Sequence, residues 1–420
     1  MLRYSFIPSS SLSLEQLRLA LMNYVVSLQR EEGFVIRIED TDQTKIKEGI
    51  DSQNIAILEL FGIQAKELLY QSKNFKFHSA MAIDLLHRKK AFNCFCTKEE
   101  LEIKKARAKE QKRLYVYDGT CEQLPAEMVI DNPNPFRVRI KSPKEKICFE
   151  DMIQGDLCFL PEEIGSFVIL NTDKTPTHEF ATAVDDMLSD ISVVIDKEEH
   201  IESTPKEIYI RSLLGYTKEI EYAHIPPLQN ANLDLKELLS EGILPQALAN
   251  YLLILGSKKE AIFTLEDAKE HFDIKEFTKS AVFDKEELLS INQKHLMLLD
   301  NKELSRYVGF ADAEIGKVAK LYLDRAKTTK ELKEIITTLF TKKDLPQDFQ
   351  VDAIKIKELV TQAPYFDKYE KFEAYLLKQS SLKRDQLRKI LSYFFITEDQ
   401  AKIKDIYNSL KNYIKEVFVL

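Results

Sequence analysis

Charged side chains gather in residues 37–42, Arg-Ile-Glu-Asp-Thr-Asp, directly after the apolar residues 34–36. A guanidinium and several carboxylates at the end of a strand can bind the charged groups of a small substrate. They can equally form an ion-pair and capping network that only stabilises the fold. The residue types leave both interpretations open.

The first turn of the chain contains no glycine, and no glycine occurs before Gly33. In a nucleotide-binding α/β sheet, the first strand-to-helix turn brings backbone close to phosphate, which usually requires glycine. Here Ser13, Leu14 and Glu15 are typical of a helix N-cap followed by an acidic first turn. The turn therefore predicts the start of a helix better than it predicts a phosphate site.

Three of the five cysteines, Cys94, Cys96 and Cys121, lie near one another in sequence. Three thiolates suit a closed tetrahedral zinc site, although a site with only three secure ligands is weak and free thiols are the alternative. Asp118 or Glu122 could supply a fourth ligand. An odd number of cysteines does not suggest the disulfide framework of a secreted protein.

Periodicity in the first half of the chain predicts an α/β fold. Apolar residues at three- and four-residue steps favour an amphipathic helix over about 14–30, and 34–38 is typical of a parallel core strand. Further helices are expected at about 44–61, 75–91 and 97–113. Strands are expected at 136–140, 146–149, 165–170 and 190–195, with proline-containing turns between the first three. A helix should begin at Thr204-Pro205.

From residue 229 to Leu420 nearly all of the sequence is expected to be helical. With 420 residues, 44% hydrophobic and 30% charged, the chain is an ordinary globular protein of two to four domains. Its net charge of −8 gives no global attraction to nucleic acid. The basic residues in 104–113 could be a solvated helix face or a local RNA contact. No signal peptide and no apolar run of ~18 residues is evident, which predicts a cytoplasmic protein without a membrane partner.

Residues 3–10, Arg-Tyr-Ser-Phe-Ile-Pro-Ser-Ser, together with Arg18, Asn23 and residues 37–42, resemble the opening of glutamyl-tRNA synthetases, which are class I aminoacyl-tRNA synthetases. The resemblance spans nearly the whole chain. It implies ATP-dependent ligation of glutamate to tRNA, with tRNA as partner and a monomeric protein. The implied domains are a Rossmann-like catalytic-type domain over 1–90 and 186–228, an inserted α+β acceptor-binding-type subdomain over 91–185, a helical stem-contact connector over 229–320 and a helical anticodon-binding-type domain over 321–420.

Both ATP signatures of that family are expected to be missing. Its His-Ile-Gly-His turn aligns with Ser13, Leu14, Glu15 and Gln16, which supply one weak hydroxyl donor and an acid beside phosphate. Its mobile Lys-Met-Ser-Lys loop should follow Leu228, where this chain is roughly ten residues shorter, a change larger than a typical loop. The remaining segment reads as an ordinary amphipathic helix.

The resemblance assigns substrate contacts to Arg3, Ser5 and Glu39, with His178 and Thr182 on a loosely preserved wall of the glutamate pocket. Asp196 stands where the family has an arginine that takes part in glutamate binding. An acid at this position repels the substrate carboxylate instead of forming a bidentate pair. Lys197 is a poor surrogate because it lacks a planar fork.

The spacing of Cys94, Cys96 and Cys121 matches the zinc knuckle of some bacterial members, although Gln123 replaces their histidine ligand. Loss of one transition-state donor typically costs ~10²- to 10³-fold in rate, and here several losses compound. The sequence therefore favours a non-catalytic paralogue that binds tRNA or a protein partner. The alternative is an active but impaired glutamate–tRNA ligase, and a protein without a present role fits the same sequence.

Overall fold

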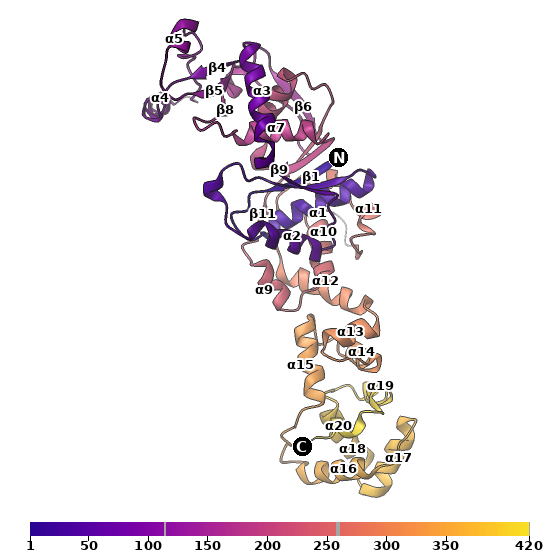
Figure 1. The fold of residues 1–420 in the computed structure, drawn as a ribbon. Helices are drawn as coiled ribbons and strands as arrows, with labels where there is room; N and C mark the ends of the chain where they lie inside the picture. The colour runs from indigo at the N-terminus through magenta and orange to yellow at the C-terminus, as the bar shows by residue number, and fades with distance from the viewer. Residues whose placement is uncertain (113–114, 258–260, 420) are drawn as a thin grey trace. The chain divides into compact units, whose positions relative to one another are not determined.

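The computed structural model describes residues 1–112, 115–257 and 261–419 (Figure 1). The chain divides into two units, which are taken one at a time below. Unit 1 comprises Met1–Asn232 and Leu252–Phe283, and unit 2 comprises Leu233–Tyr251 and Asp284–Leu420. Arg113, at the end of an expected helix, and Leu420 lie outside the described residues.

A seven-stranded sheet of order β3-β2-β1-β9-β10-β6-β7 forms the centre of unit 1. Its strands are β1 (Leu2–Phe6), β2 (Phe34–Ile38), β3 (Glu67–Tyr70), β6 (Ile147–Asp151), β7 (Gly155–Phe159), β9 (Val193–Lys197) and β10 (Glu221–Ile225). Neighbouring strands are parallel, except that β6 and β7 form an antiparallel hairpin. The β-branched and aromatic residues of β1, β2 and β9 are almost completely buried, as expected for the central strands of a parallel sheet.

Helix α1 (Leu14–Gln29) connects β1 to β2, so the predicted helix and the predicted strand after it are confirmed. Its apolar stripe, which includes Leu14, Leu17, Leu21 and Val25, is completely buried. Figure 1 shows α1 and α7 on opposite sides of β1 and β9. The other helices beside the sheet are α2 (Ile50–Leu60), α3 (Phe75–His87), α7 (His178–Leu188) and α8 (Thr204–Leu213). Helix α8 begins at the expected Thr204-Pro205.

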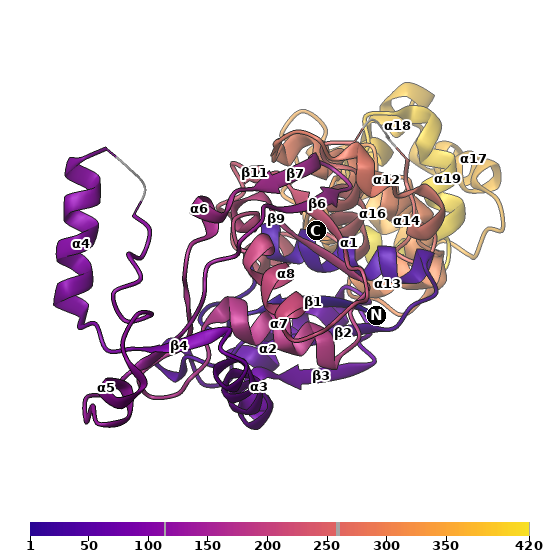
Figure 2. The ribbon, with the colours of Figure 1, turned by 90° about the horizontal axis from the view of Figure 1, so that it is seen from above.

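A second, antiparallel sheet of order β4-β5-β8 has its own apolar core in unit 1. Its strands are β4 (Ala91–Cys94), β5 (Arg137–Ile140) and β8 (Val168–Leu170). The helices in the same part of the chain are α4 (Lys98–Glu110), α5 (Ala126–Ile130) and α6 (Pro161–Ile164). Val138, Ile140 and Ile169 pack against Ala82 and Leu85 of α3. Figure 2 shows α4 standing apart from both sheets.

The hairpin of β6 and β7 differs from what the sequence indicated. It lies within 91–185, yet β6 pairs with β10, so the hairpin extends the seven-stranded sheet. Cys148 and Cys158 face each other across the hairpin and form a disulfide bond. The odd cysteine count gave no sign of this pair, because pairing depends on strand register and not on number.

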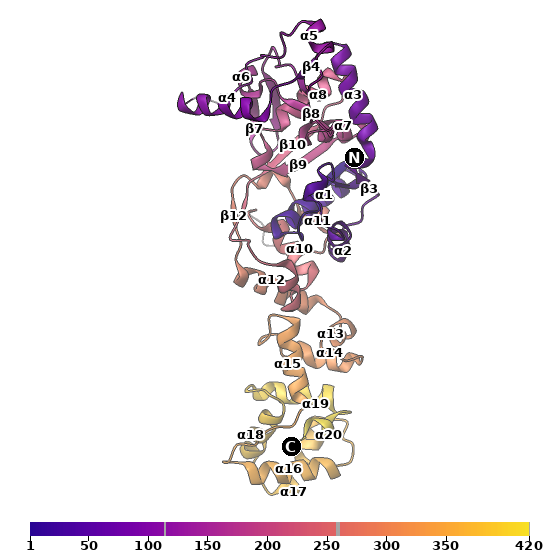
Figure 3. The same ribbon diagram turned by 60° about the vertical axis from the view of Figure 1, so that its left-hand side comes forward.

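Unit 1 ends with β11 (Leu228–Gln229), which pairs in parallel with β12 (Ala281–Val282), and with α11 (Ala268–His271). Helix α10 (Pro245–Ile254) contributes residues to both units. The other helices, all in unit 2 and drawn in pink to yellow in Figure 3, are α9 (Leu235–Ser240), α12 (Lys285–Leu298), α13 (Asn301–Tyr307), α14 (Ala313–Lys320), α15 (Thr329–Leu339), α16 (Gln350–Gln362), α17 (Tyr369–Ser380), α18 (Arg384–Phe394), α19 (Gln400–Leu410) and α20 (Ile414–Val417). The helical C-terminal region is thus confirmed. Among the described helices, none combines the length and the apolar character needed to span a bilayer.

Candidate functional site

The strand order of the large sheet reverses at β1, because β2 lies on one side of it and β9 on the other. In open parallel sheets, ligands bind beyond the carboxyl ends of the strands at such a point. A cavity of about 610 Å³ lies there. Five of the residues proposed from the sequence line it, namely Ser5, Gln16, Glu39, His178 and Asp196. The other proposed residues, Arg3, Ser13, Leu14, Glu15 and Thr182, are not part of its lining.

Arg3 is buried, and its guanidinium is used inside the protein. Its Nε and Nη2 donate to the carboxylate of Asp186 at 2.7 and 3.2 Å, and its Nη1 donates to Ser5 Oγ at 3.1 Å. Arg37 Nη1 donates to the same Asp186 at 2.5 Å. Burial opposes ionisation of Asp186, but the charges of Arg3 and Arg37 outweigh it and hold its pKa well below the usual range. The three side chains form a buried ion-pair network, to which the charged run of residues 37–42 contributes only Arg37.

Glu39 and His178 come together at the wall of the cavity. His178 Nδ1 lies 3.5 Å from Glu39 Oε2, and Arg37 Nη2 lies 3.6 Å from Glu39 Oε1. Thr182 lies one turn further along α7, where it is buried, and its Oγ1 has no hydrogen-bond partner among the described residues. Of the two residues that the sequence proposes for this wall, His178 is therefore exposed and Thr182 is buried.

The turn before α1 forms hydrogen bonds within itself. Gln16 N donates to Ser13 Oγ at 3.2 Å, and Ser13 N donates to Gln16 Oε1 at 2.9 Å, which is a capping box. Leu12 N donates to Asn54 Oδ1 at 3.0 Å. The interpretation of this segment as a helix cap is confirmed. Three backbone donors of this turn, those of Leu12, Ser13 and Gln16, are thus bonded to side chains of the protein and do not face a phosphate.

Glu15 lies in the first turn of α1 and binds a lysine from β9. Lys197 Nζ lies 2.9 Å from Glu15 Oε2, and Leu228 N donates to Glu15 Oε1 at 3.2 Å. Burial opposes ionisation of Glu15, but these two donors outweigh it and lower its pKa. The lysine is thus occupied by an acid of the protein. Sequence reasoning missed this pair, since 182 positions separate its members and no local pattern connects them.

Asp196 is an anion at the edge of the cavity. It accepts hydrogen bonds from Lys197 N at 2.7 Å and lies 2.9 Å from His200 Nδ1. Burial opposes ionisation, but the bond with His200 and the charge of Arg3 outweigh it and lower the pKa of Asp196 to about 2. The same contact raises the pKa of His200. The cavity therefore carries a fixed negative charge at this position at neutral pH.

The three cysteines near β4 converge, with their Sγ atoms all within 4.8 Å of one another. Four ligands about 2.3 Å from a tetrahedral zinc lie about 3.8 Å apart, so this spacing fits a zinc ion. Tyr117 Oη lies 3.6 Å from Cys94 Sγ and 3.4 Å from Cys96 Sγ. The oxygen of this tyrosine is thus a fourth polar atom beside the three sulfurs. Sequence reasoning missed Tyr117, although it lies only four residues before Cys121.

The fourth ligands suggested from sequence have other partners. Asp118 forms an ion pair with Lys104 at 2.8 Å, and Glu122 approaches Lys141 at 3.5 Å. Neither carboxylate belongs to the group of atoms that converges on the three sulfurs. The geometry therefore favours Tyr117 over either acid.

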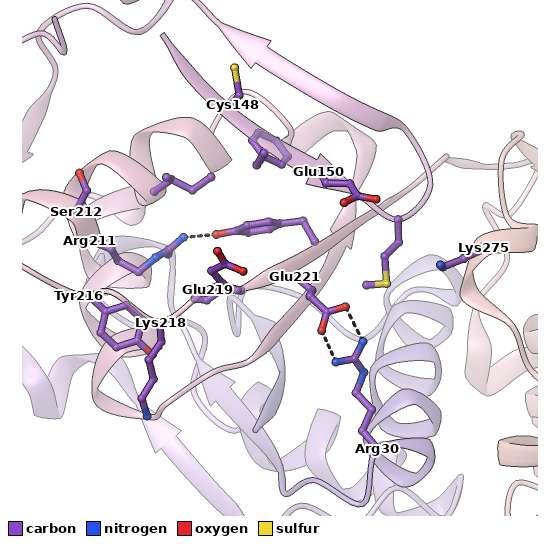
Figure 4. A pocket seen from close by; sticks show the side chains of 15 residues that line it. Arg30, Cys148, Glu150, Arg211, Ser212, Tyr216, Lys218, Glu219, Glu221 and Lys275 are labelled. Carbon is purple, nitrogen blue, oxygen red and sulfur yellow. Dashed lines mark hydrogen bonds and ion pairs between the residues drawn. The ribbon is translucent and has the colours of Figure 1, made fainter. Parts of the chain in front are cut away.

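A further cavity of about 590 Å³ lies beside β10 and β6 (Figure 4). Both of its arginines are bonded to other groups of the protein. Arg30 forms a bidentate pair with Glu221 at 2.5 and 2.8 Å, and Arg211 donates to the hydroxyl of Tyr222. Because both arginines are engaged in this way and the strand order does not reverse here, this cavity is a weaker candidate than the one at β1.

Comparisons with known proteins agree with this geometry. Residues 1–290 match the family described as tRNA synthetases class I (E and Q), catalytic domain. A protein of Sulfurimonas denitrificans named Glutamate--tRNA ligase 2 is 47% identical over 430 residues, which cover 99% of this chain and 100% of that protein. A glutamate--tRNA ligase 1 of Nitratiruptor sp. is 41% identical, with 99% and 100% covered.

Solved structures show the same fold. A glutamate tRNA ligase from Elizabethkingia meningosepticum, solved in complex with its amino acid, superposes with a TM-score of 0.83 at 20% identity, covering 99% of this chain and 97% of that one. The glutamate-tRNA synthetase of Elizabethkingia anophelis gives a TM-score of 0.80 at 20% identity, with 99% and 98% covered. Taken with the sequence matches, these findings place the chain in the glutamyl-tRNA synthetase family of class I tRNA synthetases.

Proposed function

We propose that this chain is a non-catalytic member of its family, which binds tRNA but does not transfer glutamate. The family uses ATP and binds tRNA. The observation that carries the proposal is Glu15, a carboxylate fixed by Lys197 and Leu228 N in the first turn of α1. An anion at the N-terminal end of a helix occupies the position where phosphate would otherwise be stabilised.

The surrounding donors support the same conclusion. Catalysis at a phosphate requires donors aimed at the charge that develops in the transition state. The backbone N–H groups of Ser13 and Gln16 each donate to the other residue's side chain in the capping box, and the cation of Lys197 is bound to Glu15. ATP would have to break these contacts and would then meet a carboxylate, so these residues do not fit its phosphates.

The length of the segment after β11 offers separate support. Only residues 230–234 connect β11 to α9. The comparison with the Sulfurimonas denitrificans protein extends over 430 residues, whereas this chain has 420, so at least ten aligned positions fall against gaps in this chain. A deletion of that size agrees with the absence of a Lys-Met-Ser-Lys loop between β11 and α9.

Binding of tRNA is supported by a surface of unit 2. A hollow of about 620 Å³ is lined by Arg325, Phe349, Lys389 and Tyr393, among others. Lys389 Nζ lies 5.2 Å from the centre of the Phe349 ring, and the rings of Phe349 and Tyr393 are 5.5 Å apart. Aromatic faces beside cations are the usual means of holding single-stranded nucleotides. We also propose the acceptor, stem and anticodon roles of 91–185, 229–320 and 321–420.

We further propose that Cys94, Cys96 and Cys121 hold a structural zinc ion, with the oxygen of Tyr117 as fourth ligand. Such an ion would tie the end of β4 to residues 117–121 and would take no part in chemistry. The spacing of the sulfurs and the approach of Tyr117 Oη support this assignment.

An active glutamate–tRNA ligase is the second candidate. The curated relatives at 41–47% identity are named glutamate–tRNA ligases, and the match covers almost the whole chain. If this chain is active, Lys197 must leave Glu15 and an unidentified group must replace the missing cations.

Two assays on the purified protein separate these candidates. We expect no ATP–pyrophosphate exchange and no transfer of labelled glutamate to bulk tRNA, while a gel-shift assay detects a complex with tRNA. The Sulfurimonas denitrificans protein assayed in parallel is the positive control. Turnover within ~10³-fold of that control would refute the non-catalytic proposal, because the loss of one donor alone costs about that much. Absence of a gel shift would refute tRNA binding and leave a protein partner.

A further inference from the structure

We propose that Cys148 and Cys158 form a site of reversible thiol exchange, at which a low-molecular-weight thiol such as glutathione opens the disulfide bond and loosens strand β7. The two cysteines lie opposite each other in the β6–β7 hairpin and are joined by the disulfide bond. Both residues are exposed. The inference concerns the chemistry of this pair alone, so it depends neither on tRNA binding nor on the cysteine cluster near β4.

The position of the pair makes its sulfurs accessible to a thiol. Strand β7 is the last strand in the order of the seven-stranded sheet, so it forms an edge of that sheet. Alternate side chains of a strand share one face, and the exposed residues Cys148, Glu150, Asp156 and Cys158 share the outer face of the hairpin. Figure 4 shows the sulfur of Cys148 directed away from Arg211. Exposed disulfides are reduced more readily than buried structural ones.

Other contacts hold β6 in the sheet without the disulfide. On the opposite face of the hairpin, the ring of Phe149 lies 5.2 Å from that of Tyr222 in β10 and 6.2 Å from that of Phe159. At the end of β6, Asp151 Oδ2 lies 2.6 Å from Nδ1 of the buried His224. None of these contacts uses either sulfur, so we expect β6 to stay in the sheet after reduction.

Strand β7 is the element whose order depends on the disulfide. Glu150 and Asp156 are direct partners across the hairpin, and they lie two positions from Cys148 and Cys158 on the same face. Carboxylates that face each other across two strands repel and destabilise the pairing of the strands. The disulfide bond keeps the strands together against this repulsion. Once the bond is open, we expect the hydrogen bonds of β7 to break more often.

The exchange is balanced by two molecules of the small thiol. The first, as its thiolate, attacks one sulfur of the pair and forms a new S–S bond, while the Cys148–Cys158 bond breaks and its electron pair leaves on the other sulfur. That sulfur takes up the proton that the small thiol lost. A second thiolate then attacks the small-thiol sulfur of this mixed disulfide and releases the remaining cysteine. Two thiols are thus oxidised to one small disulfide, and the protein disulfide is reduced to two cysteine thiols.

The test uses the full-length protein, equilibrated first with oxidised and then with millimolar reduced glutathione, and read by alkylation with site-resolved mass spectrometry. We expect oxidised glutathione to close the bond and reduced glutathione to open it, with circular dichroism unchanged and a glutathione adduct trapped on one of the two cysteines. In the reduced protein, alkylation of Cys148 and Cys158 should be at least about tenfold faster than that of the buried Cys94 and Cys121. A bond that does not form, or that opens only when the protein unfolds, overturns the proposal.

Hydrogen exchange of the oxidised and reduced protein tests the effect on β7. Reduction should raise the exchange of residues 155–159 several-fold and leave that of residues 221–225 in β10 unchanged. Glu150→Gln removes the repulsion across the hairpin and should abolish most of this rise. Glu102→Gln, at an exposed ion pair with Lys105, is the matched control and should retain it. Equal exchange of residues 155–159 in the two forms refutes control of β7 by the disulfide.

Discussion

At the scale of single residues, Asp186 is the buried anion on which the base of the candidate site depends. Its side chain is completely buried, and it accepts hydrogen bonds from both Arg3 and Arg37. Removing one partner of a buried ion-pair network leaves uncompensated charge in a low-dielectric interior. The arginines would then be buried without an acid, which is more costly than losing the hydrogen bonds alone.

We therefore expect Asp186→Ala to destabilise the protein by about 3–5 kcal/mol. The effect should depend on pH. Because the pKa of Asp186 in the folded state lies below its value in the unfolded chain, its contribution is fully present above about pH 4 and is lost as the pH falls further. Thermal unfolding of the unmodified chain and the variant between pH 7 and pH 3 should show the difference narrowing toward acid.

Asp84→Ala is the matched control for that experiment. Asp84 also pairs with an arginine, Arg88, but both side chains are about half exposed. Exposed ion pairs contribute less than about 1 kcal/mol. Equal destabilisation by Asp84→Ala and Asp186→Ala would contradict the role assigned to burial.

The cysteine cluster gives a second prediction at this scale. Elemental analysis of the purified protein should find about one zinc per chain, since the three sulfurs lie within 4.8 Å of one another, close enough to share one ion. Cys121→Ser should remove most of the metal, and Tyr117→Phe should weaken retention against a chelator without abolishing binding. Replacing both Cys148 and Cys158 by serine should not change the zinc content, because these two sulfurs are bonded to each other. Metal-free protein of normal thermal stability would rule out a structural zinc.

At the scale of elements, the sequence predicts those parts whose pattern is local. Helix α1 and strand β2 were located to within one residue, because an amphipathic stripe and a β-branched run are each complete in a few turns. The Ser13 cap was identified for the same reason. The β6–β7 hairpin joins β10 in a distant part of the chain, so nothing in residues 147–159 indicates the sheet to which it belongs.

The same limit applies to the candidate site. Glu39 and Asp196 were identified by their positions in a family pattern, whereas the Glu15–Lys197 pair and the unpartnered Tyr4 hydroxyl arise only when β1, β9 and α1 pack together. A partner that lies 182 positions away has no signature in either local segment. The sequence can thus identify which side chains belong to a site. The hydrogen bonds and ion pairs among those side chains become known only from the folded structure.

Lys343 supplies a prediction at the scale of helix ends. Its Nζ donates to the carbonyls of Leu339, Thr341 and Val417, at 2.9, 3.2 and 3.0 Å, so it connects the end of α15 to the end of α20. Burial lowers the pKa of Lys343 to about 8. Because the unfolded chain has a lysine pKa near 10.4, it binds more protons than the folded chain between these two values.

Stability should therefore rise as the pH increases from about 8 toward 10, by up to about 3 kcal/mol. Lys343→Met retains most of the buried volume but cannot titrate, and it should remove this component of the rise. The measurement is the urea midpoint of the unmodified chain and the variant at several pH values. Parallel pH profiles for the two proteins would show that the charge of Lys343 is not the cause.

At the scale of the whole molecule, a net charge of −8 must be reconciled with binding to a polyanion. Long-range attraction is absent, so binding has to come from local contacts in which cations neutralise phosphates and aromatic rings stack on bases. The hollow lined by Phe349, Lys389 and Tyr393 offers both kinds of group. Lys389 Nζ lies 2.5 Å from Asp348, so it must leave this exposed ion pair to contact a phosphate. Salt also screens repulsion by the rest of the acidic surface, so the fall of affinity with salt should reflect only the few local contacts between cations and phosphates.

Filter binding of bulk tRNA between about 50 and 200 mM salt tests this account. We expect log K to fall linearly with log salt, and Lys389→Gln to make the slope shallower by about one unit, as the loss of one phosphate contact requires. Tyr393→Ala should weaken binding by about 1–3 kcal/mol with little change in slope, because stacking releases no counterions. Lys371→Gln, at an exposed ion pair with Asp367, is the control and should alter neither quantity. If Lys371→Gln and Lys389→Gln change the slope equally, tRNA contacts unit 2 through diffuse charge and not through this hollow.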